Sequence, residues 1–144
     1  MRILSVDVGT GTQDIYLYDS RVDLENGFKL VIPSPTMIVH RRLKIATQRG
    51  QAVALTGVTM GGGPSHWAAR DHAKLGHVVY ATPEAARTFD DDLERVQADG
   101  IQILGDDEIA ALPDAVVRLE LRDFDFSAIG RAFGEFGVNL DGLD

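Results

Sequence analysis

The fold is decided by the stretch Val6-Asp7-Val8-Gly9-Thr10-Gly11-Thr12-Gln13-Asp14 near the start of the chain. The apolar run from Ile3 to Val8 is rich in β-branched residues, which predicts a buried strand. The glycines and threonines break this run. Residues 14–19 then alternate between two faces, with Ile15 and Leu17 on one of them, as in a second strand. The stretch therefore predicts a β-hairpin with its tip in the glycine-threonine segment.

The tip of this hairpin has the composition of a phosphate-binding loop. Glycine lets the backbone approach an anion closely, and successive N–H groups can point at phosphate oxygens. The candidate phosphate-binding residues are Gly9, Thr10, Gly11 and Thr12. Asp7 is the candidate Mg²⁺ ligand, acting through water, and Asp14 is a candidate for orienting water or metal. The alternative is an ordinary tight turn, in which glycine and threonine are also common.

The rest of the chain alternates strands with helices and contains no repeat or linker. Asn26-Gly27 is a strong turn signal before a third strand, Phe28 to Ile32, which completes an antiparallel meander. Further strands are predicted at residues 52–58, 77–81, 101–104 and 115–121. Helices are predicted at residues 36–49, 64–75 and 90–98, after the Thr82-Pro83 start, and after the N-cap Asp125. The pattern indicates an α/β fold.

A second glycine cluster, Gly61, Gly62 and Gly63, lies between a predicted strand and a predicted helix. The N-terminus of a helix favours anions because its N–H groups are unpaired and its dipole is positive there. No Gly-Lys-Ser/Thr follows, so the cluster is not a Walker A loop. The alternative is a glycine-rich turn from strand to helix without a ligand.

The order of meander, helix, buried strand, helix and strand resembles one lobe of the actin-like, ribonuclease H-like superfamily, and the hairpin resembles its first phosphate motif. The resemblance implies one mixed sheet, three antiparallel strands followed by parallel strands, with flanking helices. The resemblance also implies that the fourth predicted strand, residues 52–58, lies beside the first, residues 3–8, and parallel to it. Both glycine loops would then lie on one sheet edge, and the expected ligand is Mg-ATP.

The chain more closely resembles an actin-like family that is often labelled as a pyruvate formate-lyase activating enzyme. The matching stretches are residues 7–14, 17–19, 33–36, 55–64 and 81–88. The resemblance implies that residues 1–144 form one N-terminal lobe of a longer, two-lobed protein. The second lobe would supply the adenosine pocket and half of the phosphate contacts. Activases of that kind hold an iron–sulfur cluster through cysteines, and these 144 residues contain none, so we predict no radical activase activity.

The composition and net charge of the chain limit the classes of partner that it is expected to bind. The net charge is −8, from 14 basic and 22 acidic residues, which disfavours nucleic acid and anionic membranes as partners. No signal peptide or membrane-spanning run is evident, and the absence of cysteine permits the cytoplasm, which is the predicted location. His66 and His72 are six residues apart, a spacing that does not suit a helical metal site. They are predicted to be surface or interface residues, and His72 is also a pocket candidate.

Two functions fit the sequence. The first is the nucleotide-binding lobe of an actin-like ATPase or kinase-type protein, because phosphoryl transfer depends mainly on positioning and charge neutralisation. The second is a non-catalytic scaffold or regulatory module that keeps the fold, since no base with a partner is evident in the sequence. The expected partners are a nucleotide and either a second actin-like lobe or another copy of the chain.

Overall fold

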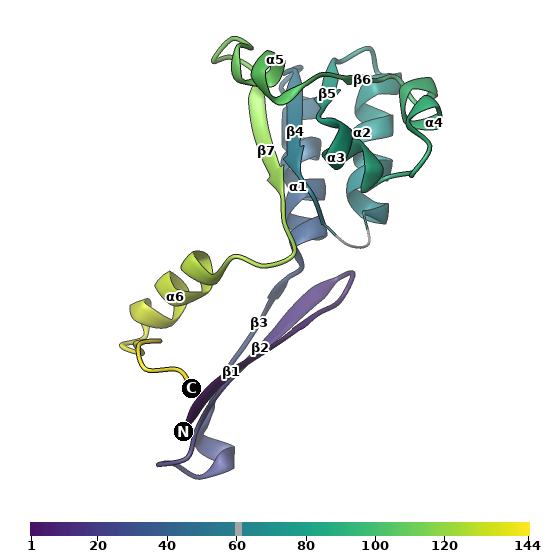
Figure 1. Ribbon diagram of the computed structural model, residues 1–144. Coiled ribbons are helices and arrows are strands. Elements are labelled where there is room, and N and C mark those ends of the chain that lie inside the picture. The colour runs from purple at the N-terminus through teal and green to yellow at the C-terminus, as the bar shows by residue number, and fades with distance from the viewer. Residues whose placement is uncertain (60–61) are drawn as a thin grey trace. The chain divides into compact units, whose positions relative to one another are not determined.

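The computed structural model describes residues 1–59 and 62–144 (Figure 1). The chain divides into two compact units. Unit 1 contains Met1–Ser34 and Phe124–Asp144, and unit 2 contains Pro35–Asp123. Each unit has its own sheet and its own hydrophobic core.

Unit 1 contains the predicted meander. Its elements are β1 (Arg2–Val8), β2 (Thr12–Asp19), the short 3-10 helix η1 (Leu24–Asn26), β3 (Phe28–Pro33) and α6 (Phe126–Glu135). The three strands form an antiparallel sheet in the order β1-β2-β3. The hairpin and the third strand are therefore confirmed.

One face of this sheet is apolar and packs against α6. Ile15 and Leu17 are each 2% exposed and cluster with Ile129 and Phe133 of the helix, which confirms the predicted alternation. The Asp125 side chain accepts a hydrogen bond from the Ala128 N–H at 2.8 Å, so the predicted N-cap is confirmed as well. Asp7 and Asp14 lie on the opposite, exposed face.

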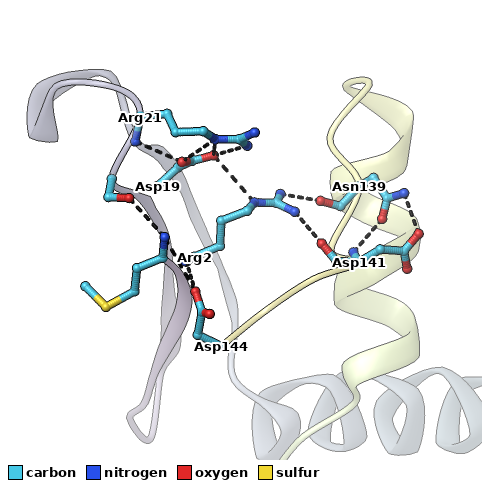
Figure 2. A network of polar contacts seen from close by, with 8 residues as sticks. Arg2, Asp19, Arg21, Asn139, Asp141 and Asp144 are labelled. Atoms are coloured by element: carbon cyan, nitrogen blue, oxygen red, sulfur yellow. Dashed lines mark hydrogen bonds and ion pairs between the residues drawn. The ribbon is translucent and has the colours of Figure 1, made fainter.

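A polar network joins the end of the chain to β1 within unit 1 (Figure 2). The Arg2 guanidinium donates to the carbonyl oxygens of Asn139 and Asp141, both at 2.5 Å. The same guanidinium lies 3.5 Å from the Asp19 carboxylate. The Asp144 N–H donates to the Arg2 carbonyl at 2.9 Å, so the last residues are fixed to the outer edge of β1.

Unit 2 is a parallel α/β unit. Its helices are α1 (Pro35–Gln48), α2 (Gly63–Lys74), α3 (Pro83–Arg87), α4 (Leu93–Ala98) and α5 (Asp106–Ala110). Its strands are β4 (Val53–Gly57), β5 (Val79–Ala81), β6 (Ile101–Ile103) and β7 (Val117–Leu121). The strands pair in parallel in the order β6-β5-β4-β7.

Strand β4 is buried on both faces, as its continuous apolar sequence predicts. Val53 and Leu55 belong to the larger core, which includes Leu43 of α1. Ala54 points to the other face and packs against Ile109 of α5. All of these β4 side chains are 0% exposed, because helices cover the sheet on both sides.

The predicted α/β class, the antiparallel meander and the parallel strands are present, but they form two sheets rather than one mixed sheet. β4 pairs with β5 on one edge and with β7 on the other, so neither edge is available to β1. The prediction that β4 pairs with β1 is therefore wrong. The two glycine loops belong to different sheets, so they do not share a sheet edge. Within the described chain, each helix is too short or too polar to cross a bilayer.

Candidate functional site

The tip of the β1–β2 hairpin is a tight turn. The Gly9 N–H donates to the Thr12 carbonyl at 2.9 Å, which leaves Thr10 and Gly11 as the two residues of the turn. A Cβ atom at Gly9 would lie 3.2 Å from the Thr12 carbonyl oxygen, whereas one at Gly11 would meet nothing within 4 Å. Close approach therefore favours glycine at position 9, and the side of the turn at Gly11 is open.

Ser34 holds this turn in place through two hydrogen bonds. Its N–H donates to the Gly11 carbonyl at 3.1 Å, and its hydroxyl donates to the Thr10 carbonyl at 2.5 Å. Ser34 is 0% exposed, so these bonds are shielded from water. Within the part of the chain that the structure describes, the N–H groups of Thr10 and Gly11 donate no hydrogen bond. The turn thus has its carbonyls occupied and two adjacent donors free at an exposed surface.

Two carboxylates lie beside the turn on the exposed face of the sheet. Asp7 and Asp14 are directly opposite each other in the β1–β2 register. The Thr12 hydroxyl donates to the Asp14 carboxylate at 3.3 Å. Like charges at directly opposed positions destabilise a sheet, and a cation between them would relieve that repulsion. Mg²⁺ commonly uses one or two protein carboxylates and completes its shell with water and phosphate oxygens, so this pair fits it.

Among residues 1–59 and 62–144, no group of three or more His, Asp or Glu side chains is arranged to hold a metal ion. A Mg²⁺ ion at Asp7 would consequently depend on ligands from water and from the bound phosphates.

The second glycine cluster is only partly described. Gly61 lies outside the described residues. Gly62 is the N-cap residue of α2, and a Cβ atom there would lie 2.7 Å from both the Cγ2 atom and the carbonyl oxygen of Thr88. At Gly63 the nearest neighbour of such an atom would be the Trp67 ring at 3.8 Å. Close packing against Thr88 explains the glycine at position 62, and anion binding at Gly62 and Gly63 stays a prediction.

The structure reveals a histidine–carboxylate pair that the sequence did not suggest. His66 Nε2 lies 2.9 Å from Asp99 Oδ2. The His66 ring stacks on Phe89 with 4.8 Å between centroids and 8° between planes. His66 is in the first turns of α2, whereas Asp99 is the C-cap of α4, 33 residues away. Because the two residues are so far apart in the sequence, their spacing gives no indication that they pair. The histidine–carboxylate pair is therefore recognised only in the tertiary structure.

His72 is buried in the interior of unit 2, so the prediction that it is a surface or interface residue is wrong. Its ring is 0% exposed, with Nδ1 2.7 Å from the Thr47 hydroxyl and the ring centroid 4.9 Å from that of His77. Nε2 is buried and has no hydrogen-bond partner among the described residues. Burial lowers the pKa of His72, and the neighbouring His77 lowers it further, while main-chain groups of Gln51 and Val78 act in the opposite direction.

Comparison with known protein families shows which family the chain belongs to. A family described as "Putative pyruvate format-lyase activating enzyme (DUF1786)" matches residues 60–143, more than half of the 144 residues. The chain belongs to this family. No curated protein and no solved structure matches it. The matched residues of the chain include the second glycine cluster, the His66–Asp99 pair and α6. The hairpin tip at residues 9–12 lies outside the matched residues.

Proposed function

We propose that the β1–β2 hairpin binds the phosphate groups of a nucleotide, with Mg-ATP as the expected ligand. The observation that carries the proposal is the pair of free N–H groups at Thr10 and Gly11, on a turn whose carbonyls are held by Ser34. Phosphate oxygens accept hydrogen bonds from such adjacent backbone donors. In a chain with a net charge of −8, donors without a formal charge are a suitable means of holding an anion.

The two carboxylates support the same function. Asp7 and Asp14 would hold Mg²⁺ at the base of the turn, directly or through water. When bound, Mg²⁺ supplies positive charge that neutralises the β- and γ-phosphates. The chain's own part is to fix the turn through Ser34 and to present the Thr10 and Gly11 donors at a defined distance from the carboxylates.

The wider proposal is an actin-like lobe that works with a second lobe or a second copy. The meander and the phosphate-type turn support it, whereas the pairing of β4 with β7 departs from the arrangement that the resemblance implied. We do not extend the proposal to radical activase chemistry. The activating enzyme named in the family description would need cysteine ligands for an iron–sulfur cluster, and these 144 residues contain none.

The test is an NMR titration of the ¹⁵N-labelled chain with ATP, with and without Mg²⁺. We expect the Thr10 and Gly11 amide resonances to shift saturably with Mg-ATP, and more weakly when Mg²⁺ is omitted. Asp7→Asn should weaken Mg-ATP binding by about tenfold, because a charge-assisted metal contact is lost. Asp23→Asn changes the same charge at an exposed position outside the hairpin and is the matched control.

A folded chain whose Thr10 and Gly11 amides do not respond to millimolar ATP or pyrophosphate would refute phosphate binding at this turn. The second candidate function, a non-catalytic interaction module, would then be favoured. One observation already supports that candidate: Phe124, Phe126 and Phe136, in and beside α6, are 43%, 48% and 73% exposed. Exposed aromatic side chains of this kind are enriched at protein interfaces.

A further inference from the structure

Unit 2 contains a cavity between α1 and the outer strand β7. Its volume is about 280 Å³, and it opens to solvent. Arg42, Ile45 and Arg49 of the α1 region line one side, and Val117, Arg118 and Leu119 of β7 line the other. Figure 1 shows α1 lying along β4 and β7. The cavity therefore combines a helix face, a sheet edge and an apolar floor.

The α1 side of the cavity is positively charged. The helix contains Arg41, Arg42 and Lys44 but no acidic residue, although the whole chain has a net charge of −8. Arg42 and Arg49 are exposed, and neither forms an ion pair with any residue that the structure describes. Two unpaired guanidinium groups beside apolar side chains favour a ligand that is both acidic and partly apolar.

On the β7 side, some backbone groups have no hydrogen-bond partner among the residues that the structure describes. The Val117 N–H donates to the Ala52 carbonyl at 2.9 Å, so alternate residues from Val117 onward bond toward β4. The backbone N–H and C=O of Arg118 and Glu120 consequently point away from β4, toward the outer edge of the sheet. The Arg118 guanidinium donates to the Leu112 carbonyl at 2.7 Å, on the face opposite Val117, so it is the main chain of Arg118 that borders the cavity.

We propose that an extended acidic segment of a partner protein binds this cavity as an added strand along β7. Strand addition satisfies both the donors and the acceptors of an exposed edge. Phosphate or another small anion would satisfy only the N–H groups, so the edge favours a peptide backbone. Acidic side chains of the segment pair with Arg42 and Arg49, and an apolar side chain between them contacts Ile45.

The spacing of the two arginines predicts the sequence pattern of the segment. Arg42 in α1 and Arg49, the residue after its end, are seven positions apart, which at the rise of an α-helix is about 10 Å along the helix axis. Residues on one face of a strand recur every ~6.7 Å, so acidic residues four apart lie about 13 Å apart. The long arginine side chains can cover the difference. The segment thus has two acidic residues four apart, with an apolar residue midway on the same face.

The probe is a blocked, fluorescein-labelled peptide, Ser-Glu-Thr-Val-Thr-Glu-Ser, added to the full 144-residue chain at 0.15 M salt, where charges beyond ~8 Å are screened. We expect saturable binding by fluorescence anisotropy. Replacing both cavity arginines, Arg42→Ala with Arg49→Ala, should weaken binding by about tenfold. The matched control is Arg41→Ala with Lys44→Ala, which removes the same charge from exposed positions outside the cavity and should leave the affinity within about twofold.

Strand addition has its own signature in the peptide. N-methylation of one alternate set of amides should abolish binding, because those amides face β7, and methylation of the other set should have little effect. The peptide Ser-Glu-Glu-Val-Thr-Thr-Ser, with the same composition but its acidic residues on opposite faces, should bind at least several-fold more weakly. Equal tolerance of both methylated sets would overturn strand addition. Absence of binding, or inorganic phosphate bound at Arg42 and Arg49 without the peptide, would overturn it as well.

Discussion

At the scale of single residues, two buried polar side chains, Ser34 and His72, make contacts that the sequence did not indicate. Ser34 is buried, and its two bonds to the carbonyls of Thr10 and Gly11 shape a turn 23 to 24 residues earlier in the chain. His72 is also fully buried, with one ring nitrogen on the Thr47 hydroxyl and the other without a partner among the described residues. Neither role could be read from the sequence, because each depends on a contact that is distant along the chain.

The burial of His72 predicts how stability depends on pH. Its pKa is lowered in the folded state from an ordinary value of 6.5, so below pH 6.5 the unfolded chain binds a proton that the folded chain does not. The contribution of His72 to the free energy of unfolding should therefore be fully present above pH 6.5. It should decline as the pH falls below 6.5 toward the lowered pKa of the folded state. His72→Gln should reduce this decline, as measured by urea denaturation between pH 8 and pH 5. His40→Gln is the control, and an unchanged slope in His72→Gln would show that other groups cause the decline.

At the scale of elements, local patterns predicted what each segment becomes but not which segments become neighbours. The continuous apolar run at Val53 to Leu55 correctly predicted a strand covered on both faces, because coverage depends on the strand's own side chains. It could not identify β5 and β7 as the neighbours of β4, since several strands of similar composition compete for one edge. The hairpin was predictable because its two strands are adjacent in sequence.

The start of α2 illustrates how one glycine can be required by packing alone. A Cβ atom at Gly62 would lie 2.7 Å from Thr88, whereas one at Gly63 has room. Gly62→Ala should lower the free energy of unfolding by about 1–3 kcal/mol through overpacking. Gly63→Ala should leave it unchanged or slightly raised, because alanine is the better helix former. Urea denaturation of both variants measures the difference, and equal stabilities would contradict the packing explanation.

At the scale of the whole molecule, the chain consists of two units whose elements interleave in sequence. Unit 1 takes its sheet from residues 1–34 and its covering helix from residues 124–144, so unit 2 is inserted within it. The closure of unit 1 consequently depends on contacts between the first and last residues of the chain. They include the apolar packing of the sheet against α6 and Val138. The polar contacts among them converge on Arg2 of β1, from Asp19 of β2 and from the segment after α6 (Figure 2).

The geometry at Arg2 predicts that lysine cannot replace it. The planar guanidinium donates at once to the carbonyls of Asn139 and Asp141, and a single ammonium group cannot reproduce that fork. Arg2→Lys should destabilise unit 1 by about 1–2 kcal/mol, since the side chain is only 19% exposed. Hydrogen exchange by NMR should show faster exchange of the amides at Val138 to Asp141.

The same experiment separates a local role of Arg2 from a global one. The amides of Val53 and Leu55 lie in the core of unit 2, so their exchange should not change in Arg2→Lys if unit 1 opens by itself. Arg21→Lys is the matched control, because Arg21 also pairs with Asp19 but is 75% exposed. Within the described chain, its side chain makes no hydrogen bond or ion pair with residues 138–144. Faster exchange at Val53 in Arg2→Lys would mean that the two units unfold as one cooperative body. Faster exchange confined to residues 138–141 would establish Arg2 as the residue that closes unit 1.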